Sequence, residues 1–131
     1  MPEKKVMERA RQDAREGKAP GTQAGEFVRE EMDHIREGKH GARLAKQAIA
    51  IGLSKARRAG VKLAPPKGGS TKTKAKAAQD SSKGRSRVHR KPSAKRSRAV
   101  TAALKREGRE AASHSALSRQ AHAAARSRKR T

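Results

Sequence analysis

Lysine and arginine side chains dominate the chemistry that this sequence offers, and they gather in its second part. Residues 38–131 hold 27 basic and 3 acidic residues, whereas residues 1–37 hold 8 and 9. A chain tolerates such a cationic excess best beside a polyanion, and each Lys or Arg that neutralises a phosphate releases counterions. The charge distribution therefore predicts binding to a phosphate backbone.

We expect the phosphate contacts to come from two stretches, an amphipathic helix near residue 50 and the basic cluster between residues 83 and 98. The predicted contacts are Lys46, Arg57, Arg58, Arg85, Arg87, Arg90, Lys91, Lys95, Arg96 and Arg98. None of them is expected to read a base, because a composition of Lys, Ala, Ser and Pro similar to that of histone-H1-like tails condenses DNA without base contacts.

The choice among polyanions depends on the aromatic residues. Modules that recognise RNA or single strands stack bases on aromatic side chains, and Phe27 is the only aromatic residue here. Duplex DNA is therefore the expected partner, and an RNA-binding or ribosome-associated factor is the alternative. A second alternative is an interaction module in plasmid maintenance or stress response. No membrane partner is expected, because no basic amphipathic helix carries bulky apolar anchors.

Histidines and hydroxyl groups are the remaining candidates for chemistry. His34, His40, His89, His114 and His122 are separated by 6, 49, 25 and 8 residues, so no two lie on one helical turn as a zinc site requires. We expect solvated histidines, no metal ligand and no cofactor. Ser113, His114 and Ser115 lie together in weakly structured sequence, so no catalytic residue and no enzyme activity are predicted.

The first 63 residues carry the elements that would position these groups. Helices are predicted over 2–16, 22–37 and 42–59, with glycine stops at Gly17, Gly38 and Gly60. The short turn after residue 37 favours an αα-hairpin. It would set Phe27, Met32 and Ile35 against Leu44, Ala48 and Ile51. The hairpin face formed by Phe27, Val28, Met32 and Ile35 also offers a surface for self-association.

Residues 48–54 leave two interpretations of the third helix open. Ala48, Gly52 and Ser54 match the spacing of a helix-turn-helix, in which the glycine makes the turn and the serine opens the recognition helix. The second helix of that motif would end at Gly60 after a few residues, and Arg58 would occupy an apolar position. An uninterrupted helix that stops at Gly60 is therefore favoured.

The rest of the chain contains few large apolar residues. Leu, Ile, Val and Phe make up about 11% of the sequence, below the roughly 20% under which a highly charged chain is expected to be disordered. We therefore predict a disordered linker over 64–98 and an Ala/Arg-rich tail over 99–131 that is helix-prone at 99–125. The expected fold is all-α, with a helical head over 1–63 and a largely disordered basic tail.

Three passages carry a resemblance to a known family. They begin at Gln23, His34 and Lys46, and the third reads KQAIAIGLSKARRAG. They are similar to an uncharacterised family of small basic bacterial proteins, a domain of unknown function that is sometimes labelled a plasmid-stabilisation protein. The resemblance covers residues 1 to about 66 and implies a bacterial origin but no mechanism. Position 44, where a polar residue such as Ser is expected, holds Leu44.

Together these features predict a sequence-non-specific, architectural DNA-binding protein that acts through phosphate contacts. The absence of cysteine fits a reducing compartment. We expect the protein in the cytoplasm, on the nucleoid.

Overall fold

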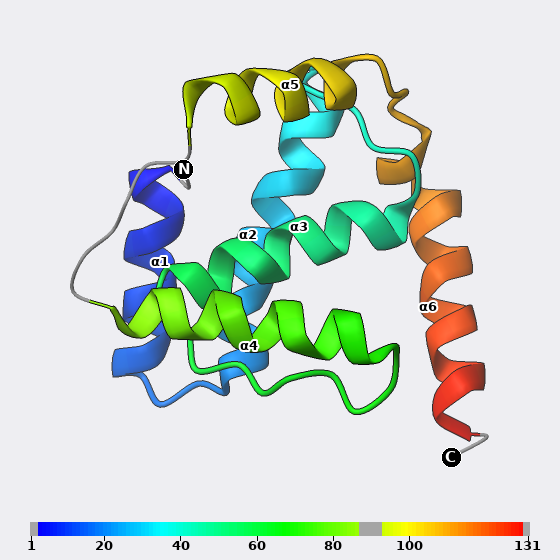
Figure 1. Ribbon diagram of the computed structural model, residues 1–131. Coiled ribbons are helices and arrows are strands. Elements are labelled where there is room, and N and C mark those ends of the chain that lie inside the picture. Colours follow the sequence, from blue (N-terminus) through cyan, green and yellow to red (C-terminus); the bar gives the residue numbers. More distant parts are fainter. Residues whose placement is uncertain (1–2, 87–92, 130–131) are drawn as a thin grey trace. The chain divides into compact units, whose positions relative to one another are not determined.

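The computed structural model describes residues 3–86 and 93–129, in which every regular element is a helix (Figure 1). The helices are α1 (Lys4–Arg15), α2 (Pro20–Arg36), α3 (Ala45–Arg58), α4 (Thr71–Arg85), α5 (Ala94–Lys105), the 3₁₀-helix η1 (Glu110–Ala112) and α6 (His114–Lys129). The chain forms two compact units, and each contains two separate stretches of sequence. Unit 1 comprises residues 1–30 and 51–91, and unit 2 comprises residues 31–50 and 92–131.

The first three helices begin and end within a few residues of the predicted bounds. Helix α2 starts with Pro20 rather than at Thr22, since proline already has the backbone φ of a first helical position. Helix α3 runs without interruption through Gly52. The uninterrupted helix is therefore confirmed, and the helix-turn-helix interpretation is wrong.

The core of unit 1 surrounds Phe27. The buried residues Val6, Ala10, Ala24, Ala56 and Val61 form one cluster with it, so α1, α2, the end of α3 and the following loop meet there. Because most of these side chains are small, helices approach closely. A Cβ atom at Gly52 of α3 would lie 2.7 Å from the Cα of Val28 on α2. This distance is too short for a carbon–carbon contact, so only glycine fits at position 52.

Helix α4 packs beside the C-terminal half of α3 in unit 1 (Figure 1). Its Asp80 is 2% exposed. The Asp80 carboxylate accepts hydrogen bonds from Ser54 Oγ at 2.8 Å, Arg58 Nε at 2.8 Å and Lys76 Nζ at 3.2 Å. Burial by itself would raise the pKa of this carboxyl, but the three hydrogen bonds outweigh burial and hold the pKa below its ordinary value. Asp80 therefore fastens α4 to α3 as a charged group.

Unit 2 is held by hydrogen bonds between the loop after α2 and residues 104–112. The Gly41 N–H donates to the Leu104 carbonyl at 2.8 Å, and the Ala42 N–H donates to the Gly108 carbonyl at 3.1 Å. Arg36 Nε donates to the carbonyl of Ala112, which is buried with Ala111. Two distant stretches of sequence thus form one unit through backbone groups and alanines.

The predicted disordered linker and tail are wrong, and with them the division into a folded head and a disordered tail. Helix α4 and the start of α5 occupy the predicted linker, and the rest of α5, η1 and α6 occupy the predicted tail. A count of large aliphatic residues missed this fold, because its interior is made of alanine and hydrogen-bonded polar groups. Ala77, Ala111 and Ala112 are at most 5% exposed. The single helix predicted over 99–125 is broken between residues 105 and 114.

The predicted packing of the αα-hairpin also needs correction. Leu44 lies before α3 and is 59% exposed, so it is not part of a buried hairpin face. Phe27, Met32 and Ile35 are at most 5% exposed within the chain itself. The face predicted for self-association is therefore covered, apart from the partly buried Val28.

Leu44 occupies the N-cap of α3, which explains why a polar residue is expected there. Its carbonyl accepts from the Ala48 N–H at 3.2 Å, and the Gln47 side chain reaches back to the Arg43 N–H at 2.7 Å. A serine hydroxyl at 44 would accept from an N–H of the first turn of α3, as an N-cap side chain does. We expect Leu44→Ser to raise the free energy of unfolding by about 0.5–1 kcal/mol, measured by urea denaturation. Leu44→Ala, which removes the same apolar surface without a cap, should give no such gain.

Candidate nucleic-acid interface

The fold buries more acidic than basic side chains, so the exposed surface has a larger excess of positive charge than the composition alone gives. The formal net charge is +23. Among the described residues, four acidic residues are buried (Asp13, Glu30, Glu31 and Asp80), but only one basic residue, Arg57, is buried. Both units contribute, with 20 Lys and Arg against 7 Asp and Glu in unit 1, and 15 against 5 in unit 2. Such a surface attracts polyanions at long range.

Helix α5 of unit 2 displays a cationic stripe. Lys95, Arg98 and Lys105 follow one another at spacings of three and seven residues, which places them on one helical face. All three are exposed, and within the described ranges none of them forms an ion pair. Leu104, the one partly buried residue of α5, lies on the opposite side. At 1.5 Å rise per residue the stripe is about 15 Å long.

Helix α6 of unit 2 carries a stripe of the same kind. Arg119, His122, Arg126 and Lys129 repeat at spacings of three and four residues, and all four are exposed. Ala116, Leu117, Gln120 and Ala124 are partly buried on the other side of the helix. The sequence analysis predicts a helix-prone stretch over 99–125 but no such stripe, because it considers the spacing of the large apolar residues and not that of the basic ones. The three-and-four spacing of the basic residues was the signal that could have found it.

The predicted phosphate contacts divide into three groups in the structure. Five of them are exposed on described helices: Lys46, Arg85, Lys95, Arg96 and Arg98. Two are engaged in the fold of unit 1: Arg57 donates through Nη2 to the Ala64 carbonyl at 2.9 Å, and Arg58 binds Asp80. The other three, Arg87, Arg90 and Lys91, lie outside the described residues. The predicted set is therefore not one continuous surface.

Arg57 and Arg85 nevertheless meet in a groove of unit 1. The groove has a volume of about 420 Å³ and lies between the segment after α3 and helix α4. Lys62 also lines it, and Lys62 and Arg85 are exposed. The Nε of Arg57 is buried with no hydrogen-bond partner among the described residues. Lys62 and Arg85 make this groove a further cationic surface, in addition to the stripes of α5 and α6.

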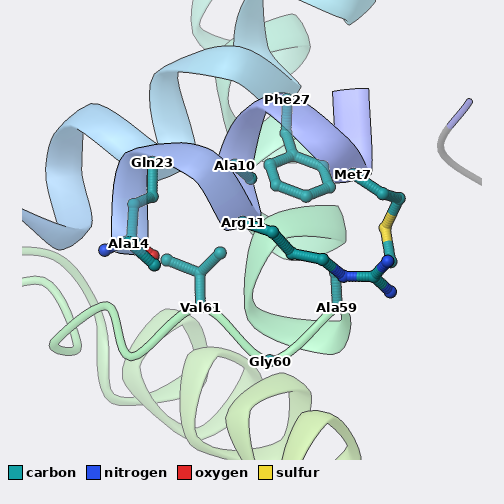
Figure 2. A pocket seen from close by; sticks show the side chains of 9 residues that line it. All are labelled: Met7, Ala10, Arg11, Ala14, Gln23, Phe27, Ala59, Gly60 and Val61. Atoms are coloured by element: carbon teal, nitrogen blue, oxygen red, sulfur yellow. The ribbon is translucent and has the colours of Figure 1, made fainter. Parts of the chain in front are cut away.

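A smaller pocket of unit 1 offers no comparable chemistry. It measures about 150 Å³ and is lined by core residues of α1, α2 and the end of α3, among them Met7, Ala10, Phe27 and Val61 (Figure 2). Arg11 is its one charged lining residue. It is a packing gap in the alanine-rich core rather than a ligand site.

Histidines contradict the expectation of solvated side chains at two positions. His34 and His40 are partly buried, and their ring centroids lie 5.9 Å apart. Together with the buried Glu31 they form a group of potential metal ligands. His34 and His40 do not lie on one helical turn, as their spacing in the sequence shows. The turn after α2 nevertheless brings His40 back toward the helix. Histidine spacing alone could not show this.

One part of the chain matches a family model, and the other comparisons found no match. No helix among the described residues is both long and apolar enough to cross a membrane. Neither the curated proteins nor the solved structures contain a match to the chain. The plasmid-stabilisation label finds no support. What does match residues 21–68, from the start of α2 to the segment after α3, is a family of unknown function, DUF6496.

Proposed function

We propose that this protein binds duplex nucleic acid, and DNA above all, through its phosphates and without reading base sequence. The observation that carries the proposal is the unequal burial of charge. Four carboxylates are buried in the fold, while the stripes of α5 and α6 stand exposed without ion pairs among the described residues. Cations that lack intramolecular partners release counterions when they bind phosphate.

The rigidity of the cationic groups distinguishes this proposal from a disordered polycation. Helices α5 and α6 begin at serine caps, in which Ser93 Oγ accepts from the Arg96 N–H and Ser113 Oγ accepts from the Ala116 N–H. Each stripe therefore presents its charges at fixed spacing along a helix. Phosphate contacts of this kind position a protein on a backbone but carry no sequence information.

The single aromatic residue favours a duplex over single-stranded RNA. Phe27 is 1% exposed, and the chain contains no Trp or Tyr. No aromatic side chain is thus available to stack on an unpaired base, which single-strand binders and RNA-recognition modules require. In a bacterium, such a protein would lie on the nucleoid.

The stripe of α5 provides the test. We expect the triple variant Lys95→Gln, Arg98→Gln, Lys105→Gln to bind two unrelated DNA duplexes roughly tenfold more weakly, and both to the same extent. The slope of log K against log salt should become shallower by about 0.9 for each phosphate that the variant no longer neutralises. Fluorescence anisotropy at several salt concentrations measures both quantities.

A matched control removes three charges elsewhere. Lys4, Lys5 and Arg11 of α1 are exposed, and the variant with Gln at all three has the same net charge as the α5 variant. It should retain nearly all of the affinity. An equal decrease in both variants would contradict a defined surface on α5. Tighter binding of structured RNA than of duplex DNA would instead support the RNA alternative.

A further inference from the structure

Three side chains with metal-binding donor atoms meet in unit 2, at the C-terminal end of α2. Glu31 and His34 lie three residues apart on α2, and His40 follows in the loop. Glu31 is fully buried, and the side chain of His40 is 14% exposed. One donor atom from each residue lies within 4.8 Å of the others, and His40 Nε2 lies 3.2 Å from Glu31 Oε2.

The end of α2 is built so that His40 turns back onto the helix. Gly38 has a φ of 79°, the left-handed conformation that glycine adopts without strain. Its N–H donates to the Ile35 carbonyl at 3.1 Å, and the Lys39 N–H donates to the His34 carbonyl at 2.9 Å. This pair of bonds is a Schellman motif, which reverses the chain directly after a helix. Glu31, His34 and His40 are brought together by backbone geometry.

The tautomer of His40 is also fixed. His40 Nδ1 lies 3.0 Å from the Gly41 carbonyl oxygen, which can only accept, so Nδ1 carries the proton. In the neutral ring, Nε2 then has a lone pair, and Nε2 lies 3.2 Å from Glu31 Oε2. A hydrogen bond from the other ring nitrogen to a backbone carbonyl is the usual support of a metal-bound histidine. The Gly41 N–H is held in turn by the Leu104 carbonyl.

We propose that Glu31, His34 and His40 bind a divalent transition-metal ion such as Zn²⁺. Two imidazole nitrogens and one carboxylate are a known donor set for zinc, with bonds of about 2.0–2.2 Å and a fourth position for water. Such bonds place neighbouring donors about 3.4 Å apart in a tetrahedron, close to the 3.2 Å between His40 and Glu31. Closing the remaining distances, at most 4.8 Å, requires small side-chain rotations.

The site would fasten the last turn of α2 to the loop that contacts residues 104–108. The chain has few carboxylates and few histidines. A metal ion therefore has few competing sites on the same chain. This inference does not depend on nucleic-acid binding, and either can be wrong while the other is right.

Titration of the metal-free full chain with Co²⁺, followed by visible absorption and then by competition with Zn²⁺, tests the site. We expect one saturable site in the natural sequence. His34→Gln and His40→Gln should each weaken it at least about tenfold. The matched control is His122→Gln, which removes an exposed histidine of α6 in the same unit and should leave the affinity unchanged.

The site would be overturned by the absence of saturable binding in the natural sequence, or by an equally large decrease in affinity in His122→Gln. A measurement on the unsubstituted chain guards against variants that fold poorly. Of the five histidine ring signals in its NMR spectrum, Zn²⁺ should shift two strongly, and these should be the signals that His34→Gln and His40→Gln each remove. Equal shifts of all five signals, or of none, would likewise overturn the site.

Discussion

The Asp80→Ala variant is expected to lose roughly 2 kcal/mol of the free energy of unfolding, measured by urea denaturation at neutral pH. The side chain is 2% exposed and accepts from Ser54, Arg58 and Lys76. Its removal leaves the partly buried Ser54 hydroxyl and the half-exposed Arg58 and Lys76 side chains without their acceptor. Hydrogen bonds to a charged group contribute more to stability than bonds between neutral groups. Helix α4 should separate from α3 first, because Asp80 joins the two helices through its hydrogen bonds from Ser54 and Arg58.

Asp33 on α2 provides the matched control, since it is an exposed aspartate. Asp33→Ala should change stability by less than about 0.5 kcal/mol. Acid supplies a second check, because the pKa of Asp80 is lower in the folded state than in the unfolded chain. Its stabilising contribution is therefore complete above the unfolded pKa near 4 and is lost as the pH falls through the folded pKa. If Asp80→Ala retains full stability, α4 is held by something other than this carboxylate.

The Gly41→Ala variant is expected to destabilise unit 2 by roughly 2–4 kcal/mol. A Cβ atom at this position would collide with the backbone carbonyl of Glu107. The loop would have to move away, and it would lose the hydrogen bonds from Gly41 to Leu104 and from Ala42 to Gly108. Urea denaturation followed by circular dichroism should show this destabilisation as an earlier transition.

Gly108→Ala is the control for this variant, because it adds the same methyl group to the other side of the contact. No atom lies within 4 Å of a Cβ at Gly108, so its effect should stay within about 0.5 kcal/mol. Equal destabilisation by both alanines would mean that the close approach of Gly41 to Glu107 is not responsible.

The sequence predicted the first three helices well because each combines an apolar spacing with a glycine stop. It failed after residue 63, where the criterion was the number of large aliphatic residues. The signals that the criterion ignored were the serine caps: Ser70, Ser93 and Ser113 each accept a hydrogen bond from the N–H three residues later. A capping serine before an alanine-rich stretch favours a helix even where large apolar residues are few.

The candidate interface was predictable in its charge but not in its geometry. Composition predicted a polycation, and the structure divides the predicted contacts between surface and interior. Arg57 and Arg58 could not be recognised as structural from the sequence, because their acceptors, Ala64 and Asp80, lie in segments that were expected to be disordered. A contact between residues far apart in the sequence leaves no pattern in the sequence around either residue. The helical wheel of α3 therefore predicts both arginines on the solvent-exposed face.

The interleaving of the two units determines the order in which the chain can fold during synthesis. Residues 31–50 leave the ribosome well before residues 104–112, whose carbonyls the Gly41 and Ala42 N–H groups and Arg36 require. Unit 1 can close once α4 has emerged, whereas unit 2 must wait across an intervening segment of the other unit. Residues 31–50 therefore remain without their packing partner while the chain is being synthesised. The turn that carries His40 can form locally in this period, but the hydrogen bonds that fix it to residues 104–112 form later.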